Sequence, residues 1–389
     1  MAWKILLCPN AFKGSLTAME AAQAMQEGIA LTAQERGLNI ETVCLPLADG
    51  GDGTLETLIA ATGGTLFEAN VSDPLGRPIV AQWGRLGGEQ ARTAVIEMAS
   101  ASGLRLLKPG EYNPLATSTC GTGELMRTAI EAGCTTLLVG IGGSATNDGG
   151  AGMAQALGFG LHTDSGTNIE VGGGALHTLT HIEPSAFWNA HHVQVIVACD
   201  VDNPLCGTQG ASAIYGPQKG ATPETIPLLD ANLTHYADIL QQTFRKDVRD
   251  VAGAGAAGGL GAGLMAFCGA ELCSGTEMVF EAVGFEDKLA ECDLIFTGEG
   301  RLDSQTVRGK VIAQVARRAK LRDIPVIALA GSVEDGTEDA LRAEGLTAAF
   351  SILDRPWETT EAMRHGYALL RDATARVFRV LDAGLTRLL

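Results

Sequence analysis

The sequence predicts an α/β protein in which a discontinuous Rossmann- or flavodoxin-like domain, built on a parallel sheet, is interrupted by a second, mixed α/β domain. Apolar runs of strand length alternate with amphipathic helical segments near both ends of the chain. Between these ends the runs become shorter and alternate, with Asp-Pro and Gly-Gly turn signals between them. The length of 389 residues also favours two domains.

We therefore expect residues 1–66 plus 288–389 to form the Rossmann-like domain and residues 67–287 to form the inserted domain. Polar and glycine-rich segments follow most of the expected strands. Because open α/β sheets bind ligands at the carboxyl ends of their strands, we expect an active site there, in the cleft between the two domains.

Composition narrows the classes of partner. The chain has 45 acidic and 28 basic residues, a net charge of -17, which argues against binding to nucleic acid or to an anionic membrane. An anionic substrate would then need a locally positive site or a metal. The nine cysteines form no C-x-x-C pair and no Cys/His metal spacing, and the first apolar run is too short for a signal peptide. These features predict a cytoplasmic protein with reduced thiols.

Residues 251–270 carry no charge and are long enough to span a bilayer. Most of them are glycine and alanine, so we predict a glycine-rich loop that leads into a buried helix rather than a membrane span. Within this stretch, residues 252–263 could act as a hinge or a phosphate-side wall. Tight helix packing is an equally good interpretation.

The first two expected strands, residues 4–8 and 42–47, are each followed by a polar loop and a helix. The first loop carries Lys13 and Ser15, and Ser15 or Thr17 could cap the helix. The second loop carries Asp49 and Asp52 among glycines. These side chains could meet at one sheet edge, although Asp-Gly pairs also occur in ordinary turns.

The inserted domain is expected to contain strands at 66–71, 78–86 and 93–98, a helix at 124–133 and a buried strand at 135–139. The segment GIGGSATNDGG and a further helix follow that strand. Gly142, Gly143 and Ser144 would cradle a phosphate, because glycines let backbone N–H groups approach an anion. Asn147 and Asp148 would position the substrate or Mg²⁺. A strand–turn–helix connection without a ligand is the alternative.

A buried strand at 193–199 ends in Asp200 and Asp202, which would share one face of an extended chain and suit Mg²⁺. Lys219 lies in a Gly/Pro loop at 210–220 and is a candidate phosphate partner. A turn at the strand end and a solvated lysine are the corresponding alternatives.

From residue 293 the strand–helix alternation returns. We expect a strand at 293–297, a loop at 298–306, a helix at 311–320, strands at 325–330 and 348–353, and a last helix at 365–388. The loop at 298–306 carries further candidate residues: Glu299, Arg301, Asp303 and Gln305.

These loops suit phosphoryl transfer, which needs cations and N–H groups around phosphates, carboxylates for Mg²⁺, and a carboxylate to accept the proton of the attacking hydroxyl. The P-loop pattern and the protein-kinase signatures are absent. Residues 140–145 match the dinucleotide pattern G-x-G-x-x-A, but no second strand ends in an acidic residue at the expected distance.

The segments PNAFKGSLTA, PLADGGDGT, GIGGSATNDGG, ACDVDNPL with GASAIYGPQKGA, and TGEGRLDSQT resemble, in order and spacing, the glycerate kinase type 1 family. The resemblance runs along essentially the whole chain. It implies ATP-dependent phosphorylation of D-glycerate and a two-domain fold with the middle inserted. In the bacterial members that the chain resembles most, it implies the 2-phospho product. Cys8 and Asp52 depart from the residues common in the family.

We assign roles to the candidate residues as hypotheses. Asp49 is the best candidate for the catalytic base, with Asp202 and Asp303 as alternatives. Lys13 and Arg301 would face the substrate carboxylate or the transferred phosphoryl group. Ser15, Lys219 and Gln305 would bind substrate or phosphate. Asp200 and Glu299 would hold Mg²⁺ that accompanies ATP.

Other functions stay open at this point. The G-x-G-x-x-A match allows an NAD(P)-dependent oxidoreductase acting on a small hydroxy acid, and the kinase could instead form the 3-phospho product. A non-catalytic sensor of a small acid or nucleotide is a third alternative. The partners would be small molecules, D-glycerate and ATP, and the chain could be a monomer or a homodimer.

Overall fold

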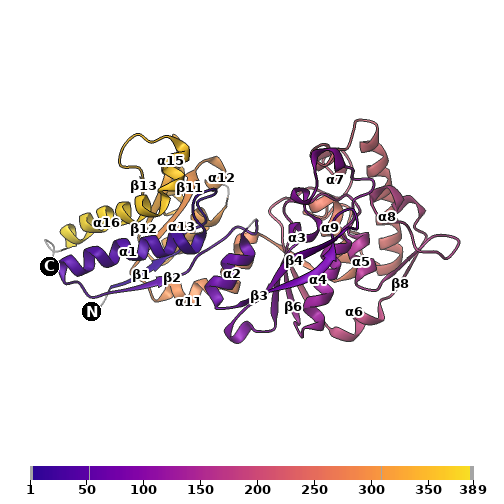
Figure 1. Cartoon of the computed structure of the whole chain (residues 1–389), viewed down its shortest axis with the longest axis horizontal. Helices are drawn as coiled ribbons and strands as arrows, with labels where there is room; N and C mark the ends of the chain where they lie inside the picture. The colour runs from indigo at the N-terminus through magenta and orange to yellow at the C-terminus, as the bar shows by residue number, and fades with distance from the viewer. Residues whose placement is uncertain (1–2, 52, 308, 386–389) are drawn as a thin grey trace. The chain divides into compact units, whose positions relative to one another are not determined.

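The computed structural model describes residues 3–51, 53–307 and 309–385, so Asp52 lies outside the described residues. The chain divides into two compact units (Figure 1). The first unit comprises the chain up to Asp49, Glu56–Thr62, and the chain from Val279 onwards. The second unit comprises Gly50–Leu55 and Gly63–Met278. The sequence analysis placed the changes of domain a few residues later, at 66/67 and 287/288.

The first unit is built on a five-stranded sheet in the order β13-β12-β11-β1-β2, and every strand pair in it is parallel. Its strands are β1 (Trp3–Leu7), β2 (Ile40–Cys44), β11 (Leu294–Leu302), β12 (Val326–Val333) and β13 (Ala348–Ser351). Numbered within the unit, the order is 2-1-3-4-5, which is that of flavodoxin-like folds. The predicted fold class, a discontinuous parallel-sheet domain with a mixed α/β insertion, is confirmed.

Helices cover this sheet. They are α1 (Ala18–Arg36), α11 (Phe285–Ala290), α12 (Ser304–Val307), α13 (Val311–Lys320), α14 (Thr337–Glu344), α15 (Thr359–Arg364) and α16 (Gly366–Leu385), with α2 (Thr54–Thr62) and α10 (Gly275–Ala282) having residues in both units. Thr17 caps α1 and forms a capping box with Glu20. The helices α1 and α16 run side by side (Figure 1). Gly28 permits this approach, because an added Cβ would lie 2.9 Å from Cβ of Thr374.

Strand β11 is longer than the sequence analysis predicted. The expected strand ended at Thr297, but Glu299 pairs with Ala330 and Arg301 with Ser332, so the strand continues to Leu302. The Gly-Glu-Gly-Arg segment suggested a loop because of its glycines, whereas pairing with β12 satisfies its backbone groups. Glu299 and Arg301 therefore project from a strand, on the same face.

The second unit contains a six-stranded mixed sheet in the order β10-β9-β6-β5-β4-β3. Its strands are β3 (Thr65–Ser72), β4 (Pro78–Arg85), β5 (Thr93–Glu97), β6 (Thr136–Gly140), β9 (Gln194–Ala198) and β10 (Glu271–Cys273). The pairs β3/β4 and β4/β5 are antiparallel, and the remaining pairs are parallel. A separate antiparallel hairpin joins β7 (Gly160–His162) to β8 (His181–Glu183).

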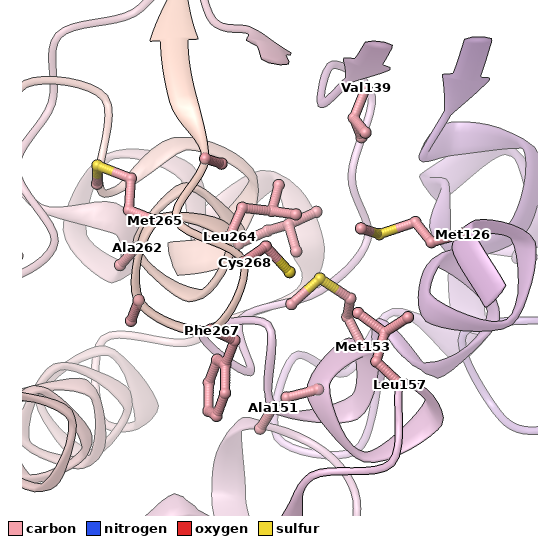
Figure 2. Packing of buried hydrophobic residues seen from close by; sticks show 14 of the residues in the cluster. Met126, Val139, Ala151, Met153, Leu157, Ala262, Leu264, Met265, Phe267 and Cys268 are labelled. Carbon is pink, nitrogen blue, oxygen red and sulfur yellow. The ribbon is translucent and has the colours of Figure 1, made fainter. Parts of the chain in front are cut away.

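The helices of the second unit are α3 (Ala99–Ser102), α4 (Cys120–Glu131), α5 (Ala151–Ala156), α6 (Ala186–His191), α7 (Ala211–Tyr215), α8 (Thr225–Phe244) and α9 (Ala256–Phe267). Short 3₁₀ turns lie at Gly88–Gln90, Leu104–Leu106, Pro109–Glu111, Gly173–Thr178 and Pro217–Lys219. Figure 2 shows the core between α9 on one side and α4 and α5 on the other, where Met126, Met153 and Phe267 are buried. This core is aliphatic and sulfur-rich, as expected from a chain with few aromatic residues.

The uncharged stretch 251–270 forms a left-handed turn at residues 257–259 and then a buried helix, the rest of α9. The N–H of Gly149 donates a hydrogen bond to the carbonyl of Gly258 (3.1 Å). An added Cβ on Gly259 would lie 2.9 Å from the Cα of Gly149. The two glycine-rich segments thus pack backbone against backbone, as the tight-packing interpretation expects. No helix in the described part of the chain has the length and apolar character needed to cross a membrane.

Candidate active site

A cavity of about 590 Å³ lies at the carboxyl ends of the strands in the first unit. It is lined by residues that follow β1, β2 and β13 and by the last residues of β11 and β12. The strand order reverses between β1 and β11, since the chain passes from β1 to β2 in one direction along the sheet and from β11 to β12 in the other. Because such crossovers are right-handed, the loops after these two strands run to opposite faces of the sheet. Such a switch point is where open α/β sheets bind ligands.

The loop after β1 brings Lys13 and Ser15 to the cavity. Phe12 and Leu16 exchange backbone hydrogen bonds (both 2.9 Å), which closes a tight turn with Gly14 at a φ of 78°. Lys13 is exposed at this turn. The hydroxyl of Ser15 donates to the carbonyl of Met363 (2.6 Å), which ties the loop to α15.

Asp49 lines the same cavity from the loop that follows β2. Its Oδ2 lies 3.6 Å from Nζ of Lys310. Lys310 immediately precedes α13 and also lines the cavity. The pair thus brings a candidate proton acceptor and a cation together at the sheet edge.

Glu299 is nearly buried in the cavity wall, with 9% of its surface exposed. Burial raises the pKa of Glu299, and the hydrogen bond from the Thr306 hydroxyl and the charge of Lys310 oppose that rise. The negative charges of Asp49 and Asp303 raise the pKa of Glu299 further. Three carboxylates therefore influence one another within this cavity.

Asp303, Arg301 and Gln305 also belong to the polar part of the lining. Oδ1 of Asp303 accepts a hydrogen bond from the Gln305 backbone N–H (2.8 Å) at the start of α12. Arg301 lies between two acidic groups, 3.8 Å from Asp303 and 3.6 Å from Glu334. Its side chain is 63% exposed, so it is accessible to a ligand.

The loop 141–150 follows β6 in the second unit, as predicted, and α5 begins after it at Ala151. Gly142 and Gly143 are exposed, whereas Ser144 is only 9% exposed and forms a bridge with Gly103. An added Cβ on Gly142 would meet no atom within 4 Å. In this loop, only Gly142 and Gly143 therefore present backbone to solvent.

Asp148 is completely buried in the second unit and accepts four hydrogen bonds. The donors are N–H (2.8 Å) and Oγ1 (2.9 Å) of Thr119 and the N–H groups of Gly150 and Gly152 (both 3.2 Å). Burial raises the pKa of Asp148, and these hydrogen bonds oppose the rise. The carboxylate thus holds the backbone of the loop in place.

Asn147 is also completely buried, and its amide donates to the hydroxyl of Ser212 (3.0 Å). Its Oδ1 has no hydrogen-bond partner within the described part of the chain. The ammonium of Lys219 donates to the carbonyl of Thr146 (2.7 Å) and is 1% exposed. Burial lowers the pKa of Lys219 to about 7, although the negative charge of Asp148 acts to raise it.

Asp200 and Asp202 follow β9 and are exposed at the carboxyl edge of the second sheet. Oδ1 of Asp200 accepts a hydrogen bond from the N–H of Gly275 (2.9 Å), the first residue of α10. The predicted metal ligands Asp200 and Glu299 thus belong to different units.

A Mg²⁺ ion bound by protein alone would need a cluster of oxygen ligands. Within residues 3–51, 53–307 and 309–385, no group of three or more acidic, histidine or cysteine side chains is placed to hold a metal. Mg²⁺ that arrives with substrate phosphates needs only one or two carboxylates. The carboxylates of Asp49, Glu299 and Asp303 fit that weaker requirement, because all three line one cavity.

Two parts of the cavity were not predicted from the sequence. Lys310 was overlooked because it stands between an expected loop and an expected helix, although a lysine close to a helix start is a usable signal for an anion site. The second part is an apolar wall formed by Ile352, Leu353, Trp357, Ala362 and Met363. Apolar residues at the end of a strand suggest core, so nothing in the sequence marked them as cavity lining.

The fold and the cavity define an α/β enzyme that handles anionic small molecules, because lysine and arginine side chains converge with carboxylates at a flavodoxin-like switch point. The model of the glycerate kinase family matches residues 5–382, and the chain belongs to that family.

Relatives named glycerate kinase match along nearly the whole chain. The glycerate kinase of Bacillus subtilis (strain 168) is 47% identical, with 96% of each chain covered. The glycerate 2-kinase of Escherichia coli (strain K12) is also 47% identical, over 98% of this chain and 99% of the relative. A crystal structure assigned as a glycerate kinase 2 of Salmonella typhimurium LT2 superposes with a TM-score of 0.90 at 45% identity, covering 99% of this chain and all of that one. The protein is thus a kinase.

Proposed function

We propose that this protein transfers the γ-phosphoryl group of ATP to the 2-hydroxyl of D-glycerate, giving 2-phospho-D-glycerate and ADP. A bond forms between the hydroxyl oxygen and the γ-phosphorus, and the bond between that phosphorus and the β,γ-bridging oxygen breaks. The hydroxyl proton passes to a carboxylate of the protein. The observation that carries the proposal is the full-length similarity to a relative named glycerate 2-kinase.

Asp49 is our proposed proton acceptor. It lines the cavity at the sheet edge, and Lys310 lies 3.6 Å away as a countercharge. Asp303 lines the same cavity and is the first alternative. Asp202 is exposed at the edge of the second sheet and remains a further alternative.

Positive charge for the transferred phosphoryl group or the acid's carboxylate comes from Lys13 and Arg301, as the sequence analysis proposes, and from Lys310. Ser15 and Gln305 line the same cavity. The Gln305 amide would donate a hydrogen bond to the bound substrate, and the Ser15 hydroxyl, whose proton goes to Met363, would accept one. Removing a single hydrogen-bond donor that is aimed at the reacting oxygens typically raises the barrier by about 2.7–4 kcal/mol.

In the second unit, we propose that the exposed backbone of Gly142 and Gly143 binds an anionic group of a substrate. Ser144, Asn147, Asp148 and Lys219 are buried and engaged within the unit. We therefore propose that these four residues act by shaping the loop rather than by touching substrate. Asp200 accepts a hydrogen bond from the first residue of α10. Its role as a metal ligand stays a hypothesis.

Mg²⁺ is proposed to enter with ATP. Glu299 and Asp303 would hold it, and the ion would neutralise charge on the phosphates. The dinucleotide-dependent alternative loses its support, because the fingerprint needs a helix directly after the glycines, whereas α5 begins only at Ala151. The predicted cytoplasmic location, the absence of nucleic-acid and membrane partners, and a monomeric or homodimeric state remain predictions.

The direct test is ³¹P NMR of the purified protein with MgATP and D-glycerate. We expect ADP and a new phosphomonoester whose phosphorus couples to one proton, the signature of the 2-phospho product. Coupling to two protons would show the 3-phospho product. No new ester, with ATP unchanged, would overturn the kinase assignment and favour a sensor of small acids or nucleotides.

A further inference from the structure

The cavity of the first unit has two chemically different walls. One wall carries charged groups from the loops after β1 and β2 and from the segment 299–310. The other wall is formed by residues 352–366, where Leu353, Trp357 and Met363 contribute apolar surface. A ligand that satisfies both walls must combine an apolar surface with negative charge.

The apolar wall is only partly covered by the protein itself. Met363 is 42% exposed, and Trp357 is partly buried. A large apolar side chain kept exposed inside a polar cavity is unfavourable unless a ligand covers it. The wall therefore has surface available for a ligand.

The indole of Trp357 is held in place without a ligand. Its Nε1 donates to Oδ1 of Asp354 (2.9 Å), and the guanidinium of Arg355 lies 4.2 Å from the ring centroid. The side chain of His365 lies 5.3 Å away, centroid to centroid. Because the ring is already ordered and its N–H is satisfied, a flat ligand can pack on the face that Arg355 does not cover, at little cost in conformational entropy.

We propose that this cavity binds the nucleotide, with the purine base against Trp357 and Met363 and the phosphates toward Lys13 and Lys310. The inference rests on the proposed function, since it takes ATP as the phosphoryl donor. A volume of about 590 Å³ falls in the range of sites for drug-sized ligands, roughly 300–1,000 Å³. D-Glycerate is a three-carbon acid with oxygen on every carbon, so it has no apolar face for this wall.

Steady-state kinetics separate the two substrates. We expect Trp357→Ala to raise KM for ATP about tenfold, the order of one base–aromatic stacking contact, and to leave KM for D-glycerate within twofold. Met363→Ala should raise KM for ATP less. Trp357→Phe should restore most of the affinity, because it keeps a flat ring. Val380→Ala removes an exposed apolar group of α16 that does not line the cavity, and is the control.

Binding of ADP alone tests the site without turnover. The chain has four tryptophans, and we expect ADP to quench part of their fluorescence while D-glycerate alone does not. Trp357→Phe should abolish that quenching but keep ADP binding in calorimetry. Trp188→Phe, in α6 of the second unit, should keep the quenching.

A raised KM for D-glycerate with an unchanged KM for ATP would overturn this inference while leaving the kinase function intact. Unchanged ADP binding in a folded Trp357→Ala protein would overturn it as well. Conversely, the protein could form no phosphoglycerate while ADP still quenches the fluorescence of Trp357. That result would support the nucleotide site and contradict the proposed reaction.

Discussion

The ammonium of Lys310 lies 3.6 Å from Oδ2 of Asp49, at the edge of the sheet where the cavity opens. The same ammonium opposes the rise in the pKa of Glu299. One cation thus compensates two carboxylates that the strand order brings to a single site. The first prediction follows from this pair.

Replacing Lys310 with methionine should lower kcat by about two orders of magnitude, because a phosphoryl-transfer site loses a cation. It should also raise the pKa of Glu299 further, since removal of a nearby positive charge disfavours the ionised form. The acidic limb of the kcat/KM profile should then move to higher pH. Lys288→Met, an exposed lysine of α11, is the control. If the acidic limb of the kcat/KM profile does not move, Lys310 does not influence the group that controls activity at low pH.

Asp49→Asn should lower kcat by about 10²–10⁴-fold while the far-ultraviolet circular dichroism and Tm stay near the wild-type values. The amide keeps the size of the side chain but cannot accept the hydroxyl proton. Asp303→Asn and Asp202→Asn should have smaller effects on kcat. Near wild-type turnover in Asp49→Asn would show that Asp49 is not the base. In that case, whichever of Asp303→Asn and Asp202→Asn loses more kcat would indicate the base.

Gly142→Ala tests the proposed anion contact in the second unit. The added methyl group meets no atom within 4 Å, so the fold should be unaffected. A ligand that approaches this backbone would be displaced, and we expect KM for one of the two substrates to rise several-fold. Gly110→Ala, whose added methyl group is equally unobstructed, should leave both KM values unchanged. Equal kinetics in the two variants would argue against a substrate at Gly142.

Asp148→Asn should lower the free energy of unfolding by about 1.5–3 kcal/mol, measured by urea denaturation. An amide turns one acceptor oxygen into a donor, which then faces N–H groups that already donate. Asp164→Asn, at an exposed turn, is the control. An increase in KM without loss of stability would instead support the original hypothesis that Asp148 contacts the substrate.

Lys219 predicts a pH dependence of stability. Burial lowers its pKa to about 7 in the folded protein, compared with 10.5 for an ordinary lysine. Between these values the unfolded chain binds the extra proton, so the free energy of unfolding should rise with pH, by at most about 1.4 kcal/mol per pH unit. Lys219→Met should flatten this rise in urea titrations at pH 7, 8 and 9. Parallel curves for the two proteins would refute the assignment, and Lys246→Met is the control.

The layout of the first unit could be predicted because buried parallel strands are continuous apolar runs, and the residues after them are polar. That reasoning placed Lys13, Asp49 and Asp303 at strand ends, where the structure brings them into one cavity. It ended β11 too early, because glycines within a strand look like a loop when the neighbouring strand is not known.

The polar residues of the second unit show the limit of such reasoning. A turn rich in Ser, Asn and Asp can face a ligand or can satisfy its own buried backbone groups, and both uses need the same residue types. Asp148 and Asn147 are buried and bonded within the unit, which only the packing of α9 and α4 around the loop reveals. Trp357 was missed for the opposite reason, since an apolar residue gives no sign in the sequence that it lines a cavity.

The position of β1 has a consequence for synthesis of the chain. Ile5 pairs with Leu294, so β1 lies inside its sheet against a strand that is synthesised 289 residues later. The second unit is complete by Met278 and can fold during elongation. In the first unit, by contrast, one edge of β1 has no strand to pair with until β11 has been synthesised. During that interval we expect the unpaired edge of β1 to be exposed, which favours pairing with other chains and aggregation of the nascent chain.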